Sequence, residues 1–496
     1  MRLTDHDASF LYTETPNTPM HGVSIVVVEG ELDFGTIYAH IESRLPRIPR
    51  YRQRLAFVPL SLAHPQWVDD AEFDLSKHVL HTEVEGSAAI DDAFELILQQ
   101  AEALLPRDRP LWQMRVVTGV PGLTVLAHLA HHALVDGASG VDISQILFDL
   151  QPDPPTTEAG EPWQPTSVPS GVSRATEAIK ENTALFAERV NRIQKSFNSE
   201  SGELVRRATE SMTRFISEPV YSAPWNRALV GRGRAFRFFK APFVNIRGIR
   251  NRLGGTVNDV ALTIVVEAAA RYMQSKGEDV GGRHLRIMCP VNVRREDEHG
   301  TLGNRVSGIF PVFDAIPMSA VERLQQVRWE TEHIKQNREA QALQLLTELM
   351  PPMPFSPVMD NSAMSGPFGA PALNFATFNP VSFLAQFAAP IVPSFISNLP
   401  MAGFNFTCTN VPGVQTTQYL AGHKILDQFA VLMLAGNLGY GAAILSYDQS
   451  LYFNLVCNPQ LMPDLDLMLE HVESVYQELT EASETAGRKT SSNTEN

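Results

Sequence analysis

The chain has 496 residues, of which 44% are hydrophobic and 19% charged. This composition is typical of a well-buried globular protein, and the length is too great for one ordinary core. A formal net charge of −15 argues against nucleic acid as a partner and against strong electrostatic attraction to anionic lipid. The three cysteines are irregularly spaced, and no apolar run suits a signal peptide or a membrane span, so we expect a cytoplasmic protein.

The most informative pattern lies at the end of a predicted strand. Residues 123–130 alternate and are rich in strand formers, and His131 and His132 follow them directly. Asp136-Gly137 then turns the chain, and 138–150 has the pattern of a helix. Strand ends that open into loops are where α/β proteins present reactive groups, so we expect a functional site here.

A histidine at this position suits proton transfer. With an ordinary pKa of about 6.5, a neutral imidazole can take a proton from a hydroxyl, amine or thiol. Asp136 could hold an imidazole directly or pair with an arginine elsewhere, and the spacing alone does not decide. Neighbouring strand residues point to opposite faces, so His131 and His132 are expected to differ, one facing a cavity and the other packing. The same alternation disfavours a zinc site, and we expect no metal.

The later chain divides at changes of composition. A proline-rich exit follows residue 150, and 171–217 has a helical composition. Strand patterns resume at Ala235 and alternate with helical segments up to a helix at 465–479. We therefore expect an N-terminal domain at 1–150, a connector at 151–234, a C-terminal domain at 235–482 and a disordered tail at 483–496.

The histidine motif resembles a known signature. His131-His132-x-x-x-Asp136-Gly137 is similar to the HHxxxDG motif of the CoA-dependent acyltransferase superfamily. Further motifs in the same order along the chain resemble the bacterial wax ester synthase/diacylglycerol acyltransferase family. They are Leu3 to Leu11, Pro19-Met20-His21, Pro110-Leu111-Trp112, Asn226, Thr256 to Val260, Pro290 to Arg294, Leu302-Gly303-Asn304, Asn410-Val411-Pro412-Gly413 and Leu420-Ala421-Gly422.

The resemblance implies an α/β fold, an α+β sandwich of two chloramphenicol-acetyltransferase-like domains joined by a helical connector, with the active site at their interface. It implies transfer of a fatty acyl group from acyl-CoA to a long-chain alcohol or to diacylglycerol. Acyl-CoA would be a co-substrate, and no cofactor would be permanently bound. The sequence indicates neither the preferred acceptor nor the acyl chain length nor the oligomeric state.

The resemblance also assigns roles to residues. His132 would be the general base, with His131 and Gly137 supporting it. Asp136 would be structural and pair with Arg294, or failing that with Arg295, although both arginines could equally be surface charges. The residues expected to form walls of the site or of an acyl tunnel are Pro110, Leu111, Trp112, Asn258, Asp259, Gly303 and Asn304. Each has a simpler reading, as a packed tryptophan, a helix cap or a turn. CoA is anionic, so we expect basic side chains where it binds. Two groups of arginines are candidates. One is Arg47, Arg50, Arg52 and Arg54, and the other is Arg232, Arg234 and Arg237.

One segment is unusual in composition. Residues 361–423 contain no Asp, Glu, Lys or Arg, and phenylalanines recur among prolines. The segment could line an acyl tunnel, form ordinary core, or expose an apolar patch, around 390–396, to a membrane or a lipid droplet. Two other functions stay open: a condensation-type transferase with a carrier-protein donor, and a lipid-binding protein of the same fold without activity.

Overall fold

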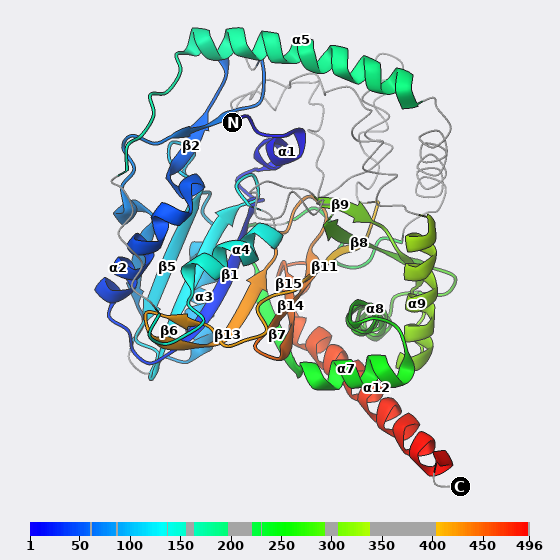
Figure 1. Ribbon diagram of the computed structural model, residues 1–496. Helices are drawn as coiled ribbons and strands as arrows, with labels where there is room; N and C mark the ends of the chain where they lie inside the picture. Colours follow the sequence, from blue (N-terminus) through cyan, green and yellow to red (C-terminus); the bar gives the residue numbers. More distant parts are fainter. Residues whose placement is uncertain are drawn as a thin grey trace.

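The computed structural model describes residues 1–59, 62–85, 88–135, 137–154, 163–196, 221–229, 231–292, 306–337 and 403–494. Two large β-sheets, each with its own apolar core and covering helices, form the body of the molecule (Figure 1). The N-terminal half of the chain builds most of the first sheet, and the C-terminal half builds the second.

The first sheet has six strands in the order β12-β13-β1-β6-β5-β4. Neighbours are antiparallel except β4 and β5. The strand predicted at 123–130 is confirmed as β6, which extends to His131. The strands are β1 (His21–Glu29), β4 (Val79–Glu83), β5 (Trp112–Thr118), β6 (Leu123–His131), β12 (Tyr419–Leu420) and β13 (His423–Val431).

Short helices cover this sheet because each contributes apolar side chains to its core. Ile41, Ile97 and Ile143, from α2, α3 and α4, are at most 1% exposed within that core. The helix predicted at 138–150 is confirmed as α4 and ends three residues earlier. The bounds are α1 (Asp5–Thr13), α2 (Phe34–Arg44), η1 (Leu45–Arg47), η2 (Pro49–Arg52), β2 (Gln53–Ala56), β3 (Gln66–Asp69), η4 (Leu75–Lys77), α3 (Ile90–Gln100) and α4 (Gly137–Leu147), with β2 and β3 forming a separate pair.

The second sheet has the order β10-β8-β11-β14-β15-β7, with β9 paired to β8. The neighbours β8, β11 and β14 are parallel, so their carboxyl ends share one edge of the sheet. Helix α8 is almost wholly buried and packs against α9 and α12. The bounds are β7 (Ala235–Pro242), α7 (Phe243–Leu253), α8 (Val257–Ser275), β8 (His284–Asn292), β9 (Val306–Ile309), β10 (Val312–Asp314), α9 (Ala320–Asn337), β11 (Phe406–Val411), β14 (Tyr440–Tyr447), β15 (Ser450–Cys457) and α12 (Leu465–Thr494).

The two halves do not separate as expected at residue 235. Strands β12 and β13 come from the C-terminal half, yet they extend the first sheet along the edge of β1 (Figure 1). An unpaired β1 would expose a row of backbone groups, and β13 covers them. The C-terminal domain predicted at 235–482 therefore contributes part of its chain to the N-terminal sheet.

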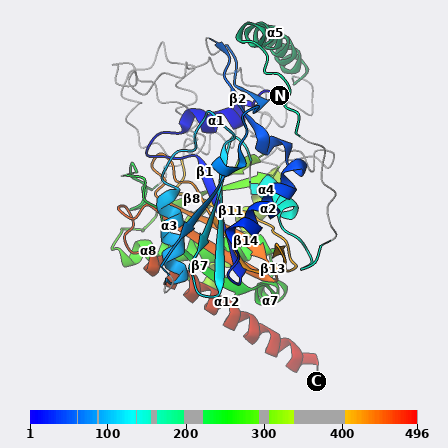
Figure 2. The ribbon, with the colours of Figure 1, turned by 90° about the vertical axis from the view of Figure 1, so that its left-hand side faces the viewer.

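The helical connector is only partly described. Helix α5 (Gly171–Ser196) begins where the composition predicts a helix, and 197–217 lies outside the described residues. Arg2 bonds Glu181, and Gln66 bonds Glu177, so α5 is attached to the N-terminal half. In both views α5 and α12 lie at opposite ends of the molecule (Figure 2).

The tail predicted to be disordered is helical as far as Thr494. The prediction was wrong because it rested on the scarcity of apolar residues, whereas a helix already started by packing can be extended at the cost of ordering one residue per added hydrogen bond. The hydroxyls of Thr480 and Thr485 each bond the carbonyl four residues earlier.

Within the described ranges, no single helix has the length and apolar character to cross a bilayer. Only α7 and α8 taken together do, and they are bent by 97°.

Candidate active site

The two adjacent histidines are held by backbone hydrogen bonds on both sides. His131 is the last residue of β6, and its N–H donates to the carbonyl of Leu111, just before β5, over 3.0 Å. The N–H of His132 donates to the carbonyl of Met20, just before β1, over 2.9 Å. The ends of three neighbouring strands therefore fix this short segment.

The two imidazoles lie in different surroundings, as the alternation along a strand predicts. His131 is 1% exposed, and its Nδ1 accepts the N–H of Ala133 at 3.0 Å. His132 is half-buried, and its ring lies 5.0 Å from that of Phe10. Gly22 adjoins this ring, since a Cβ added there would lie 3.9 Å from Nε2 of His132. The ring of His132 is therefore the more accessible of the two.

A buried carboxylate that the sequence analysis did not single out lies beside His131. Glu14 caps the end of α1, and its side chain is 1% exposed. Its Oε1 accepts the N–H of Met20 at 2.9 Å and lies 3.4 Å from Nε2 of His131, while Arg107 donates to Oε2 at 3.1 Å. Burial opposes ionisation, but His131, the Met20 amide and Arg107 outweigh it and lower the pKa of Glu14 to about 2. Glu14 is therefore an anion.

His21 and Arg234 complete the polar surroundings. His21 faces His131 across the β1–β6 pair, and its Nε2 bonds the carbonyl of Ala101 at 2.8 Å. Burial, followed by the charge of Arg234, lowers the pKa of His21 to about 3, so this imidazole is neutral. Arg234 is 9% exposed and donates to the carbonyls of Pro19 and His21. An arginine considered for CoA is thus buried at the junction of the two halves.

The Pro110-Leu111-Trp112 motif is buried next to the histidines. Trp112 stacks between Tyr51 and His78, with ring centroids 4.6 Å away in each case, and its Nε1 donates to the Tyr51 carbonyl. This is the arrangement of a packed core tryptophan. Through the Leu111 carbonyl the motif also holds the backbone of His131.

The predicted wall residues of the second half lie at the start of α8. Asp259 forms a capping box with Thr256 and also accepts the hydroxyl of Thr331 at 2.8 Å. Asn258 accepts a hydrogen bond from Asn410 at 3.1 Å, which brings together two of the sequence motifs. These contacts favour capping as the main task of Asp259.

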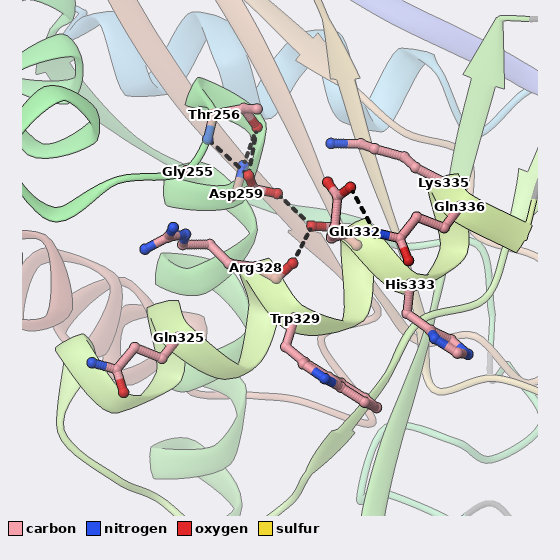
Figure 3. Close-up of a pocket in the computed structure, with 11 residues that line it drawn as sticks. Gly255, Thr256, Asp259, Gln325, Arg328, Trp329, Glu332, His333, Lys335 and Gln336 are labelled. Carbon is pink, nitrogen blue, oxygen red and sulfur yellow. Dashed lines mark hydrogen bonds between the residues drawn. The ribbon is translucent and has the colours of Figure 1, made fainter.

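An open cavity of about 680 Å³ lies between the start of α8 and helix α9 (Figure 3). Asp259 and Arg328 line it, and Trp329 stacks on His333 along the α9 side. Neither His131 nor His132 lines this cavity, so it is separate from the histidine site.

The remaining predicted site residues are not all described. Asp136, Arg294, Arg295, Gly303 and Asn304 lie outside the described residues, so their roles stay predictions. Gly137 is the first residue of α4, the helix that follows the histidines along the chain. In the part of the chain that the structure describes, no three His, Cys, Asp or Glu side chains gather as a metal site.

Sequence comparisons identify relatives of the chain. The family model described as "Wax ester synthase/diacylglycerol acyltransferase catalytic domain" matches residues 3–261. The model described as "WS/DGAT C-terminal domain" matches residues 372–480. A Mycobacterium tuberculosis protein named "probable diacylglycerol O-acyltransferase tgs1" is 26% identical over 490 residues, covering 96% of this chain and 95% of its own. Another protein of that organism, named for the same activity, is 30% identical over 352 residues, covering 68% of this chain and 72% of its own.

Solved structures of similar fold agree with this. A wax ester synthase/diacylglycerol acyltransferase from Marinobacter aquaeolei superposes with a TM-score of 0.64 at 19% identity, covering 97% of this chain and all of that one. The first condensation domain of the calcium-dependent antibiotic synthetase superposes with a TM-score of 0.61 at 13% identity, covering 97% and 95%. The expected two-part α/β fold is thereby confirmed. On the extent of the sequence match, the chain belongs to the wax ester synthase/diacylglycerol acyltransferase family of acyltransferases.

Proposed function

We propose that the protein transfers a fatty acyl group from acyl-CoA to the hydroxyl of a long-chain alcohol or of diacylglycerol, with His132 as general base. The products are a wax ester or triacylglycerol, together with free CoA. The observation that carries the proposal is the half-buried imidazole of His132, held at a strand end between the ring of Phe10 and Gly22. A base there can approach a substrate hydroxyl.

The transfer needs one proton to move twice. His132 takes the proton from the acceptor hydroxyl as its oxygen attacks the thioester carbonyl of acyl-CoA. The tetrahedral intermediate then collapses, the carbon–sulfur bond breaks, and the CoA thiolate takes the proton from the imidazolium. The acyl group passes directly from sulfur to oxygen, and the base is regenerated.

Direct transfer suits the state of the cysteines. Cys289, Cys408 and Cys457 lie on strands of the second sheet, and burial raises the pKa of each thiol, for Cys408 and Cys457 to about 12. A thiol that stays protonated is a poor nucleophile. An acyl-cysteine intermediate is therefore not part of the proposal.

Other parts of the proposal concern the surroundings of the base. Asp136 pairs with Arg294 to hold the loop, and Pro110, Leu111, Asn258, Gly303 and Asn304 border the substrate path. The family description and the relatives' names are those of wax ester synthases and diacylglycerol acyltransferases and not of condensation domains, which favours the acyl-CoA donor over a carrier-protein donor. The acceptors are lipids, so we also propose peripheral attachment to a membrane or lipid droplet through residues 390–396, which lie outside the described residues.

The test is thiol release from palmitoyl-CoA with hexadecanol or with diolein, comparing the native protein with His132→Ala. We expect a loss of about 100-fold or more with both acceptors, because general base catalysis contributes that much. His81→Ala is the matched control, since His81 is exposed and its Nε2 forms a hydrogen bond with the hydroxyl of Thr118, away from the histidine pair. Turnover unaffected by His132→Ala removes His132 from the mechanism, and the ratio of native rates ranks the two acceptors.

A further inference from the structure

We propose that Glu14 is a positioning residue, whose carboxylate holds both His131 and His132 in place for acyl transfer. The inference rests on the proposed function, because it assumes that His132 is the base. It begins from a buried anion for which the acyl-transfer chemistry itself has no use: the side chain is 1% exposed, and it contacts three separate segments of the chain.

The Glu14 carboxylate faces the ring of His131 directly. Nδ1 of this ring accepts the N–H of Ala133, so the ring proton of the neutral form is on Nε2, the atom that faces Glu14 at 3.4 Å. The orientation of this ring is coupled to the turn that follows, because Nδ1 holds the N–H of Ala133, and the carbonyl of His131 accepts the N–H of Leu134 at 2.8 Å and of Val135 at 3.3 Å. The carboxylate thereby fixes the start of the loop that follows the strand.

The Glu14 carboxylate is linked to His132 through the backbone of Met20. The oxygen that faces His131 also accepts the N–H of Met20, and the Met20 carbonyl accepts the N–H of His132 at 2.9 Å. Two residues after Met20, Gly22 adjoins the His132 ring. One carboxylate oxygen therefore positions both the backbone of the base and the strand end that borders its side chain.

The other carboxylate oxygen of Glu14 is held by Arg107. Arg107 donates to Oε2 of Glu14 and also to the carbonyl of Leu11 in α1 at 2.8 Å. This pair prevents rotation of the carboxylate, and it keeps the charge of Glu14 from being buried without a partner. A purely structural alternative is that Glu14 serves only to anchor Arg107, and the experiment must separate the two.

The variants are Glu14→Gln, Glu14→Asp and Glu14→Gln/Arg107→Met. The amide introduced by Glu14→Gln can still accept from Met20, but its NH₂ group opposes Arg107, and the charge facing His131 is lost. Arg107→Met in the double variant removes that opposition without restoring the charge. Glu267→Gln is the matched control, because Glu267 is a wholly buried carboxylate bound by Arg271 and Arg323 in the second half.

For Glu14→Gln we expect kcat to fall about tenfold or more with KM for palmitoyl-CoA within about twofold, because a misplaced catalytic group costs rate rather than binding. Glu14→Asp, which keeps the charge, should recover part of kcat, and the double variant should recover melting temperature but not kcat. Glu267→Gln should lower the melting temperature and leave kcat unchanged. Native kcat in Glu14→Gln, or full recovery of kcat in the double variant, overturns the proposal.

A second readout does not depend on turnover. Diethyl pyrocarbonate modifies neutral imidazoles, and the rate at His132 can be followed by mass spectrometry, with exposed His333 as the internal reference. Loss of the backbone restraint on His132 in Glu14→Gln should make its ring react faster. If the native protein releases no thiol, the proposed function fails, yet an unchanged His132 rate in Glu14→Gln still overturns the positioning role and a faster one supports it.

Discussion

Three imidazoles lie at one end of the β1–β6 strand pair, and their surroundings give each a different chemistry. His21 is 0% exposed and neutral, His131 faces the anion of Glu14, and His132 is half-buried beside a glycine. The histidine pair was recognisable from its neighbours in sequence. Glu14 was not, because its role depends on the end of a distant helix meeting the end of β6.

The buried neutral state of His21 predicts a pH dependence of stability. The unfolded chain binds a proton at this residue below its ordinary pKa of 6.5, whereas the folded protein resists until about pH 3. The contribution of His21 to the free energy of unfolding is therefore fully present above pH 6.5. It is lost as the pH drops from 6.5 towards 3, at a limiting rate of about 1.4 kcal/mol per pH unit.

His21→Gln removes this contribution, and its amide can still donate to the Ala101 carbonyl that His21 bonds. We expect the melting temperature of the variant to fall less steeply between pH 7 and pH 5 than that of the native protein. Parallel melting curves for the two proteins over this range would contradict the assignment.

At the scale of elements, the start of α8 illustrates how one motif serves a local need. Thr256 and Asp259 satisfy each other's backbone N–H groups, and Asp259 additionally joins α8 to α9 through Thr331. Asn258, between them, is exposed and reaches Asn410 at the end of β11. The capping pattern was predictable because it spans four residues, while the link to α9 was not.

Asp259→Ala should cost about 1–2 kcal/mol of stability, since it removes the cap and leaves the hydroxyl of buried Thr331 without this acceptor. Asn258→Ala, one residue away and exposed, is the matched comparison and should cost clearly less. Thermal or denaturant melting of both variants decides the matter, and equal losses would show that the capping box contributes little.

At the scale of the whole molecule, β13 joins the two halves. It lies in the first sheet, yet Asp427 on this strand accepts hydrogen bonds from Lys240 on β7 at 2.6 Å and from Tyr452 on β15 at 2.8 Å. Arg234 makes a second connection through the carbonyls of Pro19 and His21. The halves are therefore expected to unfold together.

Asp427→Ala should lower the free energy of unfolding by about 1–2 kcal/mol, because it leaves the hydroxyl of buried Tyr452 without its acceptor. Asp466→Ala is the control: its pair with Arg237 is exposed and should be worth about 0.5 kcal/mol or less. A loss no larger for Asp427 than for Asp466 would show that this contact does not hold the halves together.

The features that could be predicted from residue patterns are those that short stretches of chain encode. Alternation and turn residues placed His131 and His132 at a strand end, the capping pattern marked the start of α8, and the ordered motifs indicated the family. The contacts between distant residues emerged from the fold: Glu14 with His131, Arg234 with β1, and β13 with the first sheet. Hydrogen bonding and burial between distant segments depend on how those segments pack, which local propensities do not carry, and the same propensities wrongly assigned a disordered tail to the end of α12.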